Sequence, residues 1–176
     1  GANRRQNTYV AVTSANFPEV FRNYLYTSNQ GGLMSNRTLL LSIRPKYARR
    51  ILDGEKTAEL RKVRPRVKAG DIVIFYVSSP IRQVKAMAVV EEVTSDSPSE
   101  LWKRIEDEAG LSDREFHDYF SGKAVGHAIR FGELCPLDKP IALSKLRTLW
   151  PDFHPPQVHQ YVSEERVRSL LDLIEE

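Results

Sequence analysis

The stretch LLLSIRPKYARRILDGEKTAELR, residues 39–61, decides how the fold is read, because its hydrophobic pattern changes twice along its length. It opens with an almost continuous apolar run at 39–43, which is typical of a buried β-strand. Pro45 follows, and proline is tolerated in the first turn of a helix because the amide hydrogen it lacks has no partner there. Gly54 favours a helix end, since glycine readily adopts the left-handed conformation of a C-terminal cap. Residues 56–63 are again extended in pattern, so the stretch predicts a strand, a helix and a second strand.

Extended segments also dominate the sequence that follows. Residues 72–77 are apolar on both faces and are expected to lie in the centre of a sheet. Residues 84–93 and 124–131 are two further predicted strands. Helices are predicted to begin after Ser97 and Ser112, since each serine precedes a glutamate by three positions. Most strands follow one another without long crossovers, so the sequence predicts an α+β fold, a small mixed or antiparallel β-barrel surrounded by helices.

The chain is expected to divide into a main domain and two flanking segments. Residues 1–37 are predicted to be an N-terminal arm, or the remnant of a neighbouring domain with its linker, because a glycine-containing loop separates them from the rest. Residues 38–162 form the predicted barrel domain. Residues 163–176 carry apolar side chains at helical spacing and are predicted to pack on that domain as a C-terminal helix.

The composition argues against several classes of protein. No apolar run approaches the roughly 20 residues that a membrane-spanning helix needs. Cys135 is the single cysteine, which excludes an internal disulfide and a cysteine-based zinc site, and the histidines lack metal-ligand spacing. The glycine patterns of P-loop and dinucleotide-binding proteins are absent. We therefore expect no metal, no cofactor and no membrane partner, and a location in the reducing cytoplasm.

Charge is concentrated in one part of the chain. The whole chain has a net charge of +3, whereas residues 44–68 contain ten basic and three acidic residues. This basic segment (residues 44–68) on an otherwise slightly acidic protein favours a binding surface for phosphate groups. The alternative is a solvated face whose charges pair with one another.

The basic segment also carries the most specific motif of the sequence. Gly-Glu-Lys-Thr-Ala-Glu-Leu-Arg at 54–61, with Gly-Asp at 70–71 and Ser-Ser-Pro at 78–80, resembles the ASCH family, a branch of the PUA-like superfamily. The resemblance covers about residues 38–150. It implies a small β-barrel with a ligand cleft and an association with RNA or another nucleic acid. It also implies that members include binding proteins as well as enzymes.

Candidates for chemistry in the expected cleft are Lys56, Thr57, Glu59 and Glu108. On a regular strand Thr57, Glu59 and Arg61 share one face, which gives that face a hydroxyl, a carboxylate and a guanidinium. Glu108 falls on the inward-facing apolar stripe of its predicted helix, near the end where the helix dipole disfavours negative charge. A positive charge is expected to compensate it, and the basic segment is the candidate; the alternative is fraying at Gly110 that lets Glu108 reach water.

One branch of the family resembles small amidohydrolases acting on N-acylated cytidine. Its working lysine and helix glutamate match Lys56 and Glu108 by position. The place of its working threonine is held by Glu59, and a carboxylate is a poor substitute for a hydroxyl nucleophile.

Nucleic-acid binding needs cations for phosphates, aromatic rings for unpaired bases, and polar groups for base edges. The predicted contact residues are Arg44, Arg49, Arg50, Arg61, Lys62, Arg64, Arg66, Tyr47, Tyr76, Ser78 and Ser79. The sequence accordingly favours binding of RNA, another nucleic acid or a nucleoside. The alternatives are a small hydrolase, either an amidohydrolase or a ribonuclease, and a protein-interaction domain in transcription control.

Overall fold

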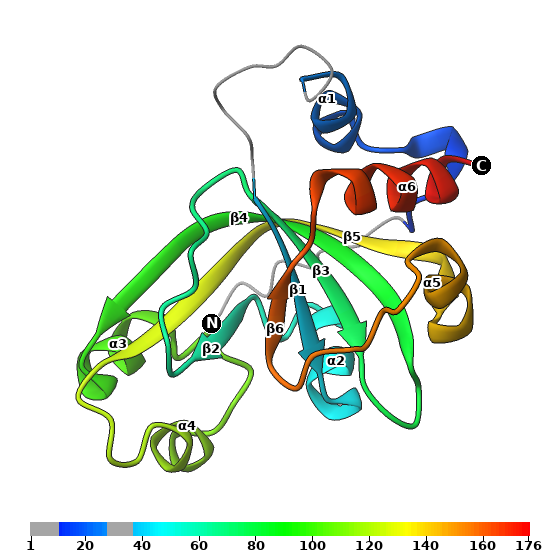
Figure 1. Cartoon of the computed structure of the whole chain (residues 1–176). Coiled ribbons are helices and arrows are strands. Elements are labelled where there is room, and N and C mark those ends of the chain that lie inside the picture. The colour runs from blue at the N-terminus through cyan, green and yellow to red at the C-terminus, as the bar shows by residue number, and fades with distance from the viewer. Residues whose placement is uncertain (1–10, 28–36) are drawn as a thin grey trace.

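The computed structural model describes residues 11–27 and 37–176, in which one curved β-sheet is flanked by helices (Figure 1). In chain order the elements are the 3-10 helix η1 (Ser14–Asn16), α1 (Glu19–Thr27), β1 (Thr38–Ile43), α2 (Pro45–Leu52), β2 (Ala58–Arg61), β3 (Ile72–Val77), β4 (Gln83–Asp96), α3 (Pro98–Ile105), α4 (Asp113–Tyr119), β5 (Gly126–Ala142), α5 (Leu143–Leu149), β6 (His159–Tyr161) and α6 (Glu164–Glu175). The predicted glycine-containing loop, residues 28–36, and residues 1–10 lie outside the described part. None of the described helices is long and apolar enough to cross a membrane.

The sheet is mixed and bent into a half-barrel. Its strand order is β2-β5-β4-β3-β1-β6, which leaves β2 and β6 at the two edges. β1 runs parallel to β3, and the other neighbouring pairs are antiparallel. The register between the long strands β4 and β5 shifts at several points, and such irregularities allow strands to bend, as both do in Figure 1. The predicted α+β fold around a mixed sheet is confirmed.

Alternation along the strands separates buried cores on opposite faces of the sheet, and a third cluster packs Leu60 and Ala128 against α3 and α4. Leu40 and Ile74 pack on one face with apolar residues of α1, α5 and α6. Leu41 and Phe75, one position along each strand, pack on the other face with residues of α2. Val67, from the connection between β2 and β3, joins this second core. We call the side of the sheet that carries Leu41 and Phe75 the α2 face.

The connection between β2 and β3 crosses the α2 face and is held to strands on both sides. The side chain of Arg64 donates a hydrogen bond to the Ser95 hydroxyl near the end of β4. The backbone N–H of Arg66 donates to the Tyr161 hydroxyl of β6 at 2.8 Å. Residues 62–71, named the strap from here on, therefore link β4 to the edge strand β6.

The segment before β1 packs against the end of the chain. Phe17 and Phe21 are 5% and 1% exposed and lie in the same core as Leu170 and Leu171 of α6. Figure 1 shows α1 beside α6, away from α2 and β2. This part of the protein therefore covers the face opposite the α2 face.

Candidate functional site

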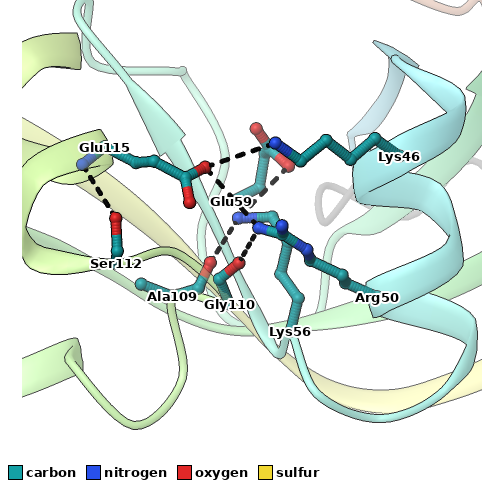
Figure 2. Close-up of polar contacts among 8 residues, drawn as sticks. All are labelled: Lys46, Arg50, Lys56, Glu59, Ala109, Gly110, Ser112 and Glu115. Atoms are coloured by element: carbon teal, nitrogen blue, oxygen red, sulfur yellow. Dashed lines mark hydrogen bonds and ion pairs between the residues drawn. The ribbon is translucent and has the colours of Figure 1, made fainter.

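Lys56 lies where α2, β2 and the α3–α4 connection meet. Its backbone N–H donates to the carbonyl of Arg50 at 3.0 Å, so the chain is still bonded to α2 at this position. Its side chain is 2% exposed, and Nζ donates to the carbonyl of Ala109 at 2.7 Å (Figure 2). The strand predicted from residue 56 consequently begins at Ala58.

Glu59 is the carboxylate partner of Lys56. The Lys56 Nζ and Glu59 Oε2 atoms are 3.9 Å apart (Figure 2). Residues three apart would point to opposite faces of a regular strand, but Lys56 precedes β2, and this allows the two side chains to meet. Burial lowers the pKa of Lys56, the Glu59 charge opposes that change, and Arg61 and Arg50 add to it.

Around Lys56, α2 and α4 are joined by charged side chains. Lys46 Nζ and Arg50 Nη1 each lie 3.7 Å from Glu115 Oε2 (Figure 2). The ring centroid of Tyr47 lies 5.5 Å from the Arg50 guanidinium and 5.9 Å from Lys56 Nζ. The protein's own cations thus surround the ring that was predicted to stack on a base.

Glu108 and Thr57 are brought together through the backbone. The Glu108 carbonyl accepts hydrogen bonds from the N–H groups of Thr57 at 2.9 Å and Ala58 at 3.1 Å. The Thr57 carbonyl in turn accepts from the N–H of Phe131 in β5 at 2.9 Å. These bonds fix the α3–α4 connection to the beginning of β2.

The Glu108 carboxylate is bound by β5. Arg130 Nη2 donates to Glu108 Oε1 at 2.9 Å, and Arg130 Nη1 donates to Glu92 Oε2 at 2.7 Å. Hydrogen bonding to Glu108 raises the pKa of Arg130. The expectation that the basic segment compensates Glu108 is therefore wrong, because Arg130 lies outside that segment.

A second set of polar side chains lies on the α2 face. Glu59 pairs across the strands with Ile129, and His159 with Leu41, and both apolar partners belong to the α2-face core. Directly opposed residues point to the same face of a sheet. Arg61 follows Glu59 by two positions in β2 and shares its face. β2 and β6 are the two edge strands, but the charge of Arg61 acts on His159, so the bent sheet brings these edges near each other. We call Glu59, Arg61 and His159 the polar cluster.

Several atoms of the polar cluster are buried without a hydrogen-bond partner in the described part of the chain: Arg61 Nε and Nη2, Glu59 Oε2 and His159 Nδ1. Arg61 as a whole is 6% exposed. Burial lowers the pKa of His159, and the charge of Arg61 adds to this. Buried polar atoms are usually hydrogen-bonded. Glu59 Oε2 has an ion-pair partner in Lys56 Nζ at 3.9 Å, whereas no hydrogen bond within the described residues satisfies the buried Arg61 and His159 atoms.

The remaining predicted contact residues differ widely in exposure. Exposed ones are Arg44, Arg49, Lys62, Arg64, Arg66 and Ser79, and half-buried ones are Arg50, Tyr47 and Ser78. Arg50 is engaged, since its Nη1 donates to the Gly110 carbonyl at 2.5 Å. Lys62, Arg64 and Arg66 lie together on the strap.

Tyr76 does not fit its predicted role. It is 2% exposed and packs in the core beneath α5 and α6, on the face opposite the polar cluster. Its ring offers no free face to a base, so the prediction that it stacks on one is wrong. Burial raises the pKa of its hydroxyl, and the charges of Arg82 and Arg147 oppose this.

Sequence reasoning missed His159, because β6 has only three residues and shows no usable periodicity. It also missed the pairing of Ser95 with His127, whose side chains come from strands far apart in the sequence.

Residues 41–132, more than half of the chain, match the family model of the ASCH domain. The chain is 29% identical over 134 residues to an ASCH domain-containing ribonuclease of Zymomonas mobilis, covering 76% of this chain and 90% of that protein. The crystal structure of ASCH from Zymomonas mobilis matches with a TM-score of 0.73 at 29% identity, covering 77% of this chain and 94% of that one. A hypothetical protein from Leishmania major shares the fold at 18% identity, with a TM-score of 0.50 over 80% of this chain and 95% of that one. The resemblance and the α+β, PUA-like fold are thus confirmed, and the chain belongs to the ASCH domain family.

Proposed function

We propose that this protein binds single-stranded RNA and holds one nucleotide against the polar cluster. The family and the ribonuclease relative support a role connected with RNA. The observation that carries the location is Arg61, a guanidinium that is 6% exposed and whose Nε and Nη2 find no partner in the described protein.

A buried charge whose N–H groups lack hydrogen-bond partners is expensive for a fold, on the order of several kcal/mol. A nucleotide would remove this penalty, because its phosphate and base oxygens accept from Arg61 N–H groups. Exocyclic amines of a base would donate to Glu59 Oε2, the buried carboxylate oxygen. Donors and an acceptor on one face suit a base edge better than they suit an inorganic anion, which only accepts.

The strap supplies the charge for the rest of the strand. Lys62, Arg64 and Arg66 are exposed on the strap, which begins directly after Arg61, and each phosphate they neutralise releases counterions. Binding is therefore expected to weaken as salt rises.

The substitution Arg61→Met tests the proposal. It keeps most of the side-chain volume and removes the unpaired charge. RNA affinity, measured by fluorescence anisotropy with a labelled single-stranded oligonucleotide, should fall about tenfold or more. The thermal unfolding temperature should stay the same or rise, since no protein partner of Nε or Nη2 is lost.

Arg114→Met is the matched control, because the Arg114 side chain is 92% exposed on α4 and pairs only loosely with Asp118 at 3.9 Å. It should leave RNA affinity unchanged. An Arg61→Met protein that binds RNA as tightly as wild type would contradict the proposal.

RNA cleavage is the second candidate function, and the ribonuclease relative is the observation that favours it. Glu59 would accept the proton of a ribose 2′-hydroxyl as its oxygen attacks the adjacent phosphorus. The 5′-oxygen leaves with a proton from solvent, giving a 2′,3′-cyclic phosphate and a 5′-hydroxyl end. Arg61 would stabilise the added charge on phosphorus. Incubation with labelled RNA should show these ends for wild type and not for Glu59→Gln, and equal cleavage by both proteins would exclude this role.

A further inference from the structure

A hydrogen-bonded set of three side chains lies on the α2 face, next to the polar cluster. Ser95 of β4 and His127 of β5 are direct cross-strand partners. The Ser95 Oγ and His127 Nδ1 atoms are 2.7 Å apart. Arg64 Nη1, from the strap, donates to the same Ser95 oxygen. We call Arg64, Ser95 and His127 the strap triad.

The order of donors follows from the chemistry of each group. Arginine only donates, so Ser95 Oγ accepts from Arg64. The single hydroxyl hydrogen of Ser95 then donates to His127 Nδ1, since this arrangement gives the hydroxyl an acceptor and the ring nitrogen a donor. His127 is then neutral with its hydrogen on Nε2. Burial, with the nearby Arg64 charge, lowers the pKa of His127 and agrees with a neutral ring.

The strap triad consequently presents donors and no carboxylate. Arg64 is exposed and retains further N–H groups, and His127 is half-buried with Nε2–H able to donate. Arg61 stands opposite His127 in the adjacent strand β2. Asp96 is the nearest acid in sequence, but as the next residue along β4 it faces the other side of the sheet and is paired with Arg104 at 3.3 Å.

We propose that the strap triad is a phosphate-binding site in which Ser95 orients both Arg64 and His127 toward the anion. Phosphate oxygens only accept hydrogen bonds, and a guanidinium beside a neutral imidazole N–H is complementary to them. The assignment of this phosphate to the backbone of a bound RNA rests on the proposed function. The phosphate would be one that neighbours the nucleotide at the polar cluster, because Arg61 joins the two sets of residues through β2.

The first test concerns the site itself and needs no RNA. Nitrogen-15 NMR of the uniformly labelled chain at pH 8 should show His127 with its hydrogen on Nε2. Added inorganic phosphate should shift the His127 Nε2 and Arg64 side-chain signals and leave the exposed His154 unmoved. A hydrogen on Nδ1, or no response of His127 and Arg64 to phosphate, would overturn the site.

Variants distinguish a strap triad that binds phosphate from one that only holds the strap on the sheet. Ser95→Ala and Arg64→Gln should weaken the phosphate response about fivefold or more, and Ser95→Thr, which keeps the hydroxyl, should restore most of it. Arg104→Gln is the control, because this side chain is 58% exposed and bound to Asp96. Equal phosphate responses of wild type, Ser95→Ala and Arg64→Gln would contradict the proposal.

RNA measurements identify the source of the phosphate. Arg64→Gln should lower affinity for single-stranded RNA and reduce the slope of log affinity against log salt by about one. A variant that loses its phosphate response but binds RNA as wild type does would assign the site to free phosphate and overturn the RNA assignment. The Arg61→Met test of the proposed function does not depend on that result, because it concerns a different residue.

Discussion

At the scale of single residues, burial gives Lys56 properties that its position in a basic segment does not suggest. Its side chain is 2% exposed, and its ammonium contacts one carbonyl and one carboxylate, those of Ala109 and Glu59. Desolvation disfavours the charged form, which is the first cause of its lowered pKa. Lys56 thus contributes to the packing of three segments and is less available to phosphate than exposed lysines such as Lys62.

The lowered pKa of Lys56 predicts how stability depends on pH. The unfolded chain binds this proton more tightly, with the ordinary pKa of 10.5. The free energy of unfolding therefore increases as the pH rises from the lowered pKa of the folded protein to 10.5. Above pH 10.5 this group contributes no further increase. Lys56→Met lacks this group. Urea unfolding at a series of alkaline pH values should show wild-type stability rising relative to Lys56→Met, and a flat or falling difference would contradict the burial account.

At the scale of elements, the α3–α4 connection is fitted closely onto the start of β2. Gly110 has a φ of +61°, and a Cβ atom at this position would lie 2.6 Å from the Cβ of Lys56. Both features demand glycine, because other residues rarely adopt this φ and no side-chain atom fits in that space. The contact keeps Glu108 and Lys56 in place around β2.

Gly110→Ala should therefore destabilise the protein by about 2–4 kcal/mol, combining backbone strain with overpacking against Lys56. Gly122→Ala is the matched control, since Gly122 has a φ of +75° with nothing within 4 Å of an added Cβ. It should cost about 1 kcal/mol, from the backbone alone. Urea unfolding of the two variants measures both, and equal losses would show that the contact with Lys56 is unimportant.

The same scale shows what the sequence could and could not predict. The strand at 39–43 and the helix that begins at Pro45 could be predicted, because hydrophobic spacing and the residues at the ends of each element indicate them locally in the sequence. The pairing of Glu108 with Arg130 was not, since it depends on how a connection and a distant strand meet in space. Likewise, β6 is too short for periodicity, so His159 was found only through its pairing with β1.

At the scale of the whole molecule, the two faces of the sheet have different roles. The face opposite the α2 face is covered by α1, α5 and α6 and, over β2 and β5, by α3 and α4, and it serves packing. The α2 face carries the polar cluster, the strap triad and the strap. The match to the ASCH domain ends at residue 132, before β6, yet His159 and Tyr161 of β6 complete this face. We therefore propose that RNA lies on the α2 face, between the strap and the edge strands.

Photochemical crosslinking of single-stranded RNA containing 4-thiouridine, with mass spectrometry of the crosslinked peptides, tests this placement most directly. We predict crosslinks in the peptides that hold residues 56–68 and residues 159–161, and their loss in Arg61→Met at equal protein and RNA concentrations. Crosslinks confined to α1, α5 and α6, or an absence of RNA binding at low salt, would contradict it.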